Sequence, residues 1–241
     1  MSMAAHQTLL GGKLSYRQLE TGHRTGIEPV LLAASIPAKP GATILEAGTG
    51  AGAGLLCLAH RIPLGLGVGL ERDPRLAALA AANLQANHFG ACAILVGDVI
   101  AAPLARRRFD HVMANPPWFD PANTASPDPL RRLARTTTAP GIEGWITSLA
   151  ALLQPRGTLT MILPAASLSA ILQACAHTQI GALKIMPLWP RAGQPAKLMI
   201  VQGSLAARTP LRLLAGMTLH DDHGFAPAAD HILRDGAALP L

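Results

Sequence analysis

The residues with the clearest chemical potential are an amide, two prolines and an aromatic ring, which follow an apolar run as Asn115-Pro116-Pro117-Trp118. The side-chain oxygen of Asn115 and the backbone carbonyl of Pro116 are two acceptors that could take both N–H bonds of a planar amino group. Such a group is a poor nucleophile because its lone pair is delocalised. Holding its two hydrogens aims the lone pair at an electrophile placed in line, and Trp118 adds a face on which a planar substrate can stack.

The two prolines make this acceptor pair rigid, because each ring fixes its own backbone angle and little further entropy is lost on binding. A methyl donor placed in line needs no protein nucleophile, and no strong base either, since the methylated cationic amine releases its proton readily. The alternative is an ordinary Pro-Pro turn with a packing tryptophan. The segments upstream argue against that alternative.

The glycine-rich stretch LEAGTGAGAG joins an expected strand at 42–48 to an expected helix at 53–61. Glycines at such a junction let the backbone approach a ligand closely, and the helix N-terminus supplies N–H donors. Glu71 ends the next expected strand, about twenty residues further on, where a carboxylate can accept both hydroxyls of a ribose. Together these features predict a nucleoside-containing cofactor. The candidate cofactor residues of the stretch are Glu46, Gly48, Gly50 and Gly52.

The glycine stretch alone does not distinguish between two cofactors. Gly48, Gly50 and Ala53 also satisfy the loose dinucleotide fingerprint, so NAD and S-adenosylmethionine compete. Asp98 ends the third expected strand and can accept a hydrogen bond from an adenine amino group at the edge of the same pocket, although it could also simply cap a turn. Asp98 and the acceptor pair at Asn115 favour S-adenosylmethionine.

Alternating strand-like and helix-like segments carry these motifs. Near-continuous apolar strands separated by helices predict an α/β fold with a doubly wound, mostly parallel, seven-stranded sheet. The last two strands lack a helix between them, which predicts an antiparallel edge strand. Asn115 follows the fourth strand, beside the first, at the carboxyl-end crevice where such folds bind ligands. The strands are expected at 42–48, 66–71, 91–98, 109–117, 158–164, 182–188 and 197–204.

Three local expectations complete the fold. Asp73 is placed to cap a helix that begins at Pro74. The Pro- and Thr-rich stretch 119–140 is too long for a plain connector and predicts a substrate loop. Residues 204–241 carry no motif with an assignable mechanism and are expected to end in a short helix.

A formal net charge of +6 and a pI near 9.9 favour a polyanionic partner. One arginine triplet precedes the fourth strand and a second group follows it, so both clusters could approach the mouth of the pocket from different sides and contact phosphates. A solvated basic face is the alternative. The candidate nucleic-acid residues are Arg106, Arg107, Arg108, Arg131, Arg132, Arg135, Arg191 and Lys197.

Several other functions find no support in the sequence. No apolar stretch has the length of a transmembrane helix and no export signal is evident, so a cytoplasmic protein without membrane contact is expected. The three cysteines are widely spaced and suit buried free thiols. His220 and His223 lack nearby cysteine partners and suit a surface turn, so no metal site is expected. No obligate protein partner is evident.

The motifs EAGTGAG, LERD, VGD and NPPW resemble those of the class I S-adenosylmethionine-dependent N-methyltransferases with an Asn-Pro-Pro-aromatic signature. The flanking segments GHRTGIEPVLLAASIP and PLWPRAGQPAKLMIVQG are most similar to the bacterial tRNA1(Val) N6-adenine methyltransferase family, whose members modify an anticodon-loop adenine of a valine tRNA. The resemblance runs from about residue 20 to the end. It implies residues 1–40 as an N-terminal extension and lid of the same domain, and 41–241 as the methyltransferase domain.

The resemblance also implies roles for single residues. The three loop glycines line the methionine and ribose part of the cofactor, Glu71 binds the ribose and Asp98 the adenine. Thr25 and Gly26 belong to the lid over the cofactor. Asn115 to Trp118 hold the target amine, and Asn115 borders the cofactor as well. Trp118 stands where the family usually has tyrosine or phenylalanine, which could change the planar substrate that fits.

Other substrates and another class of protein stay open at this point. A protein glutamine amide presents the same planar amino group, and the same turn could activate it, although the basic composition argues against this substrate. DNA adenine is disfavoured because no separate target-recognition domain is evident. A non-catalytic RNA-binding module with the same fold would need neither the intact Asn-Pro-Pro turn nor Glu71. The sequence therefore predicts methyl transfer to an exocyclic amine, best matched by N6 of an adenine in tRNA.

Overall fold

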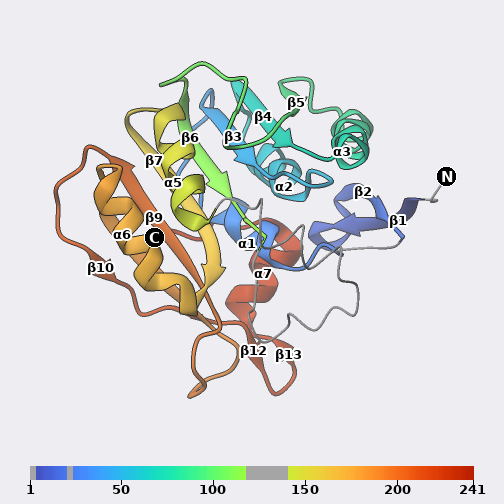
Figure 1. The fold of residues 1–241 in the computed structure, drawn as a ribbon. Coiled ribbons are helices and arrows are strands. Elements are labelled where there is room, and N and C mark those ends of the chain that lie inside the picture. Colours follow the sequence, from blue (N-terminus) through green and yellow to red (C-terminus); the bar gives the residue numbers. More distant parts are fainter. Residues whose placement is uncertain (1–3, 21–23, 118–140) are drawn as a thin grey trace, which may run out of the picture.

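The computed structural model describes residues 4–20, 24–117 and 141–241, and its elements are labelled in Figure 1. Trp118 and the expected substrate loop at 119–140 lie outside the described residues, as do Arg131, Arg132 and Arg135. The roles expected for them stay predictions.

A central sheet dominates the described part of the chain, with its strands in the order β10-β8-β9-β7-β6-β3-β4-β5 and β11 also paired to β8. Each of the seven expected strands is present. Two strands of two residues extend the far edge. The bounds are β3 (Thr43–Ala47), β4 (Leu66–Glu71), β5 (Cys92–Val96), β6 (Phe109–Ala114), β7 (Leu153–Pro164), β8 (Ile180–Trp189), β9 (Leu198–Leu205), β10 (Arg212–Leu213) and β11 (Met217–Thr218).

The doubly wound, mostly parallel sheet is confirmed, but its antiparallel strand does not lie at the edge. β9 pairs antiparallel with β7 on one side and with β8 on the other. The segment 190–197 between β8 and β9 is too short for the crossover that parallel neighbours need, so β9 returns directly beside β8. Its place between two strands satisfies its backbone groups on both sides, which an edge position would not.

Helices cover both faces of this sheet, as Figure 1 shows. α1, α2, α3 and α7 share one apolar core with Ile44, whereas α5 and α6 share the other with Leu45. Successive residues of a strand point to opposite faces, so β3 is buried on both of them. The helices are α1 (Glu28–Ala34), α2 (Ala53–Arg61), α3 (Pro74–Ala86), α5 (Ile142–Leu152), α6 (Leu168–His177) and α7 (Pro227–Asp235), with 3-10 turns η1 (Leu10–Gly12) and η3 (Ala165–Ser167). None of the described helices is long and apolar enough to cross a membrane.

Two local expectations are confirmed. The Asp73 carboxylate accepts a hydrogen bond of 2.9 Å from the Arg75 backbone N–H, and Pro74 occupies the first position of α3. The chain also ends in a short helix, α7, which packs against α1 and η1. A small hairpin of β12 (His220–Asp221) and β13 (Gly224–Phe225) precedes it.

An N-terminal hairpin, which was not predicted, precedes the sheet. Its second strand lies along α3 instead of joining the central sheet. There Asn83 and Asn87 bond the backbone of Arg17 and Ser15. The strands of the hairpin are β1 (Ala4–Leu9) and β2 (Leu14–Leu19).

Candidate active site

Three of the predicted site residues stand side by side at the carboxyl edge of the sheet. The strand register pairs Ala47 of β3 with Leu70 of β4 on one side and with Ala114 of β6 on the other. Gly48, Glu71 and Asn115 therefore each follow a paired residue by one position. Neighbouring strands lie roughly 5 Å apart, so the glycine loop, the carboxylate and the amide lie next to one another at this edge, the position where doubly wound folds have their ligand crevice.

The glycine loop crosses the end of the sheet in a tight path. Gly48 and Gly50 have left-handed backbone angles, with φ of 67° and 57°. The backbone N–H of Gly48 donates to the Leu70 carbonyl at 2.8 Å. Gly50 has open space where a side chain would stand, whereas Gly52 is buried with its Cα facing Ala80 of α3. Gly48 and Gly50 thus form the accessible surface of the loop, and Gly52 allows it to pack on α3.

Glu71 joins the loop to the next strand. Its carboxylate is 8% exposed and accepts the N–H of Gly50 on one oxygen and the N–H of Asp73 on the other, both at 2.9 Å. A carboxylate oxygen has two lone-pair directions, so each oxygen retains the capacity for another donor. Glu71 is therefore fixed in orientation and still able to accept hydroxyl groups.

Glu46 lies beneath the loop rather than on its accessible surface. Its carboxylate is 4% exposed and accepts the hydroxyl of Thr49 and the N–H of Leu55, the latter at 2.9 Å. Burial raises its pKa to about 7, although these two bonds act in the opposite direction. A Cβ at Gly54 would collide with this carboxylate. Glu46 therefore shapes the loop and the start of α2 from below, and its expected contact with the cofactor stays a prediction.

The Asn-Pro-Pro turn leaves β6 at the crevice. Asn115 is half-buried, Pro116 is buried and Pro117 is exposed. Trp145 of α5, which the sequence did not single out, reaches the same place, because its ring lies 3.0 Å from where a Cβ of Gly48 would stand. An aromatic residue on an amphipathic helix carries no signal that separates a wall of the site from the core. Trp145 walls the crevice on the side of the second core.

Comparisons with known proteins agree with this arrangement. The family model described as methyltransferase small domain matches residues 21–139. A tRNA1(Val) (adenine(37)-N6)-methyltransferase from Porphyromonas gingivalis is 35% identical over 150 residues, which are 58% of this chain and 58% of the relative. The enzyme of the same name from Actinobacillus succinogenes is 31% identical over 167 residues, covering 64% of this chain and 69% of the relative. The chain belongs to this methyltransferase family.

Solved structures show the same fold as this methyltransferase chain. A crystal structure from Agrobacterium tumefaciens, described as a predicted O-methyltransferase, covers 89% of the chain and 99% of its own, with 26% identity and a TM-score of 0.73. Geranyl diphosphate C-methyltransferase from Streptomyces coelicolor, solved with S-adenosyl-L-homocysteine, shares the fold at 12% identity and a TM-score of 0.53, covering 72% of this chain and 73% of its own. The chain spans 58% of the length of the Porphyromonas gingivalis relative it matches.

The crevice of this methyltransferase fits its cofactor, S-adenosylmethionine. The open space at Gly50 admits a ligand against the backbone, and Glu71 retains lone pairs for a ribose. Asp98, which follows β5, is exposed and accepts the N–H of Ile100 at 2.9 Å, as in a turn. That bond occupies one carboxylate oxygen, and the expected bond from Asp98 to adenine stays a prediction.

The lid expected in the methyltransferase family is anchored to the N-terminal hairpin. The Thr25 hydroxyl lies 2.7 Å from the Tyr16 hydroxyl, and the Thr25 N–H donates to the Gln18 side-chain oxygen at 3.0 Å. Burial raises the pKa of Tyr16 to about 12, so this phenol stays protonated and can donate. Gly26 follows directly and faces the Glu28 carboxylate. The contact of Thr25 and Gly26 with cofactor stays a prediction.

The first arginine triplet does not approach the crevice. Arg106, Arg107 and Arg108 are exposed and precede β6, whereas Asn115 follows it. The strand has six residues, which corresponds to roughly 20 Å between its ends. The N–H groups of Arg107 and Arg108 bond carbonyls at the end of α5, which holds the triplet at the amino edge of the sheet. The expectation that this cluster reaches the mouth of the pocket is therefore wrong.

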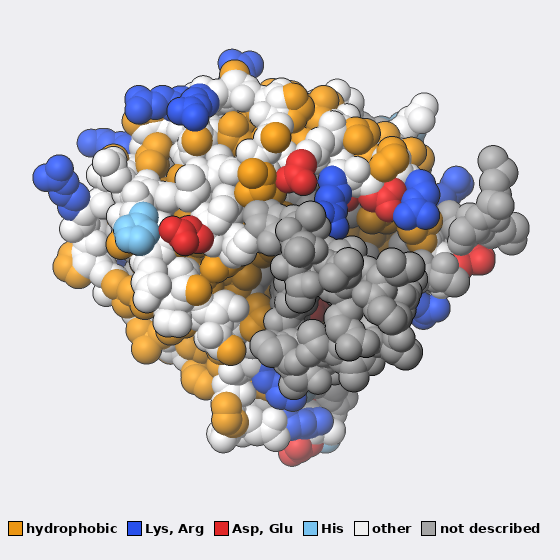
Figure 2. Space-filling model, viewed as in Figure 1, with side chains coloured by type: hydrophobic (Ala, Val, Ile, Leu, Met, Phe, Trp, Pro, Cys, Tyr) orange, Lys and Arg blue, Asp and Glu red, His pale blue; other side chains and the backbone are white. Residues whose placement is uncertain are grey.

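Other basic residues lie nearer the crevice. Arg191 is at the carboxyl end of β8, but its guanidinium donates to the Asp221 carbonyl at 2.6 Å and lies 3.6 Å from the Asp222 carboxylate. Lys197 precedes β9 at the same edge and is exposed. Arg24 and Arg72, which sequence reasoning missed, are exposed beside Thr25 and Glu71. On the face shown in Figure 2, the described Lys and Arg side chains are spread over several separate places.

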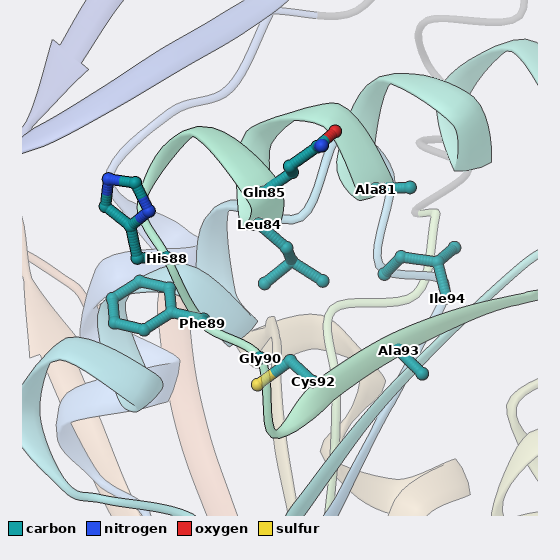
Figure 3. Close-up of a pocket in the computed structure, with 9 residues that line it drawn as sticks. All are labelled: Ala81, Leu84, Gln85, His88, Phe89, Gly90, Cys92, Ala93 and Ile94. Atoms are coloured by element: carbon teal, nitrogen blue, oxygen red, sulfur yellow. The ribbon is translucent and has the colours of Figure 1, made fainter.

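A cavity of about 430 Å³ lies elsewhere on the methyltransferase domain, between α3 and β5 (Figure 3). Leu84 lines it from α3, His88 and Phe89 from the turn that follows α3, and Cys92 and Ile94 from β5. Cys92 pairs with Gly67 near the amino end of β4, away from Glu71 at the carboxyl end of that strand. This cavity is therefore separate from the crevice that carries the motif residues.

Proposed function

We propose that the protein transfers the methyl group of S-adenosylmethionine to the N6 amino group of an adenine in tRNA. The observation that carries this proposal is the register that sets Gly48, Glu71 and Asn115 at adjacent strand ends. The names of the relatives support adenine N6 of tRNA1(Val) as the target. The net charge of +6 suits an RNA partner.

One set of residues binds the cofactor and another holds the target amine. The accessible backbone of Gly48 and Gly50 holds the methionine and ribose part of the cofactor, and Glu71 accepts the ribose hydroxyls. When bound, S-adenosylmethionine supplies an electrophilic sulfonium methyl group. Asn115 accepts one hydrogen of the target amine through its side-chain oxygen, and Pro116 accepts the other through its carbonyl. The lone pair of the amine then points toward the methyl carbon.

Burial and rigidity support this assignment. Pro116 is buried and Pro117 follows it, so the backbone carbonyl between them has little freedom to turn. Half-burial of Asn115 keeps its oxygen close to solvent-accessible substrate while the sheet fixes its backbone through β6. Positioning of this kind contributes more to the rate than binding alone, because the reacting atoms are aligned before the transfer.

A methyl-transfer assay tests the proposal. Radiolabelled S-adenosylmethionine is supplied with tRNA from cells that lack adenine N6 methylation, with protein extract treated with nuclease, or with DNA. The proposal expects label in tRNA, and a loss in the Asn115→Ala variant that far exceeds any change in its cofactor affinity. Label only in protein would replace adenine by a glutamine amide as the target. Cofactor binding without label in any of the three pools would contradict the proposed substrate, and tRNA binding without cofactor binding would indicate a non-catalytic module.

A further inference from the structure

Asn83 of α3 is a buried polar residue whose side-chain oxygen and nitrogen both form hydrogen bonds. It is 1% exposed. Its side-chain oxygen accepts the Arg17 N–H at 2.9 Å, and its amide nitrogen donates to the Arg17 carbonyl at 2.8 Å. The same nitrogen donates to the Ala51 carbonyl at 2.9 Å. One side chain thus connects β2 with the glycine loop, since Ala51 stands between Gly50 and Gly52.

The connection continues from β2 to the segment that carries Thr25. Tyr16 and Gln18 flank Arg17, and both are almost fully buried. The Tyr16 hydroxyl bonds the Thr25 hydroxyl, and the Gln18 oxygen accepts the Thr25 N–H. Asn83 therefore fixes the backbone of one residue whose two neighbours fix Thr25. A shift of β2 along α3 would move Thr25 relative to the glycine loop.

We propose that Asn83 is a positioning residue for the cofactor pocket, because it sets the distance between the glycine loop and the segment at Thr25. It acts through Ala51 and Arg17 and touches neither substrate nor reacting atoms. The proposal rests on the cofactor-binding part of the proposed function and is independent of which substrate receives the methyl group.

Asn87 provides a matched control on the same helix face. It lies one turn further along the chain, accepts the Ser15 N–H at 3.0 Å and donates to the Ser15 carbonyl at 2.7 Å. Its remaining bond goes to the Asn83 carbonyl of its own helix. Asn87 therefore holds the same hairpin strand as Asn83 does, but no bond to the glycine loop is recorded for it among the described residues.

The first test compares cofactor affinity in Asn83→Ala and Asn87→Ala by isothermal titration with S-adenosylmethionine, with melting temperatures measured in parallel. Loss of the link at Ala51 is expected to weaken binding about tenfold or more in Asn83→Ala, a loss of about 1.4 kcal/mol per factor of ten. Asn87→Ala is expected to stay within about twofold of wild type, although it also loses hairpin bonds. Equal affinities in the two variants would overturn the proposal.

The second test separates positioning from loss of folded protein. Asn83→Ala is expected to raise the KM for S-adenosylmethionine and to keep kcat within about threefold at saturating cofactor, because it does not touch the reacting groups. A protein that is merely less stable would lose kcat with an unchanged KM, and that result would contradict the role. Wild type that binds cofactor but methylates no tRNA would remove the proposed substrate and leave this inference intact.

A double-mutant cycle tests the path through β2. Tyr16→Phe removes the hydroxyl contact to Thr25 and is expected to weaken cofactor binding on its own. Combined with Asn83→Ala, its effect should be smaller than in wild type, because the segment at Thr25 is already misplaced. Combined with Asn87→Ala, its effect should be unchanged. Additive losses with Asn83→Ala, or no effect of Tyr16→Phe, would overturn the proposal, and the Tyr16→Phe result stands even if Asn83→Ala does not fold.

Discussion

At the scale of single residues, Asn115 and Glu46 show how acceptor oxygens in two different environments serve two purposes. Asn115 is half-buried at the crevice, where an amide oxygen can meet a substrate amine. Glu46 is fully enclosed below the loop, where its carboxylate holds Thr49 and Leu55 in place. At the first position an amide oxygen can accept an N–H bond of a neutral amine without placing a negative charge beside it.

Replacement of Asn115 by aspartate tests that distinction. Asn115→Asp keeps an acceptor oxygen of similar size but introduces a charge, and Asn115→Ala removes the acceptor. We expect both to reduce methyl transfer, with a loss of about 100-fold or more for Asn115→Ala when measured as kcat with tRNA. Asn115→Ala with kcat within about threefold of wild type would exclude this side chain as an amine acceptor.

The buried carboxyl group of Glu46 should make the stability of the folded protein depend on pH. Its pKa rises from 4.5 to about 7 on folding, so the folded protein holds this proton more tightly than the unfolded chain. The associated stability is fully present below pH 4.5 and is lost as pH rises through 7, with a magnitude on the order of 3 kcal/mol. Glu46→Gln lacks this change. Relative to wild type, its melting temperature should therefore increase between pH 5 and pH 8.

An exposed glutamate gives the control for this measurement. Glu143 of α5 has a side chain that is 70% exposed. Glu143→Gln should follow the wild-type melting curve across the same pH range. A Glu46→Gln variant whose difference from wild type stays constant from pH 5 to pH 8 would show that this carboxylate does not carry the pH dependence.

At the scale of elements, the strands and helices that carry the site were predictable from the sequence, and the contacts between elements were not. Near-continuous apolar runs predicted β3, β4 and β6, and the capping residue Asp73 predicted the start of α3. The N-terminal hairpin escaped prediction because its partners, Asn83 and Asn87, are distant in sequence. An asparagine pair at one helical turn's spacing inside an alanine-rich helix was the available signal.

The cap of α3 yields a prediction at this scale. Asp73→Ala removes the acceptor for the Arg75 N–H and should lower the free energy of unfolding by about 1 kcal/mol, read from chemical denaturation. Arg75→Ala keeps the cap and removes only an ion pair whose arginine side chain is 77% exposed, so its effect should be smaller. Equal losses in both variants would assign the stabilisation to the ion pair.

At the scale of the whole molecule, the net charge could be predicted from the sequence, but the positions of the charged side chains in the fold could not. The formal charge of +6 favours a polyanionic partner, yet the densest arginine triplet lies at the amino edge of the sheet, away from Asn115. Adjacency in sequence to β6 did not mean adjacency in space to Asn115, because a strand carries the chain across the whole sheet. Arg24 and Arg72 were not predicted, because each is separated in sequence from other arginines that would mark a basic cluster.

Two double variants of equal charge distinguish these positions. Arg24→Ala with Arg72→Ala removes two charges beside the crevice, and Arg106→Ala with Arg107→Ala removes two at the far edge. We expect the first pair to weaken tRNA binding about tenfold and to reduce its salt dependence, with the second within about threefold of wild type. Filter binding at several salt concentrations measures both. A larger loss in the second pair would place the RNA on the amino edge.

The most direct measurement of the central claim is the identity of the methylated nucleoside. Unmodified tRNA is incubated with S-adenosylmethionine that carries a deuterated methyl group, digested to nucleosides and analysed by mass spectrometry. Methyl transfer to adenine N6 predicts labelled N6-methyladenosine with wild type and almost none with Asn115→Ala. Label on a ring nitrogen, on a ribose or on another base, or label at N6 that persists undiminished in Asn115→Ala, would contradict it.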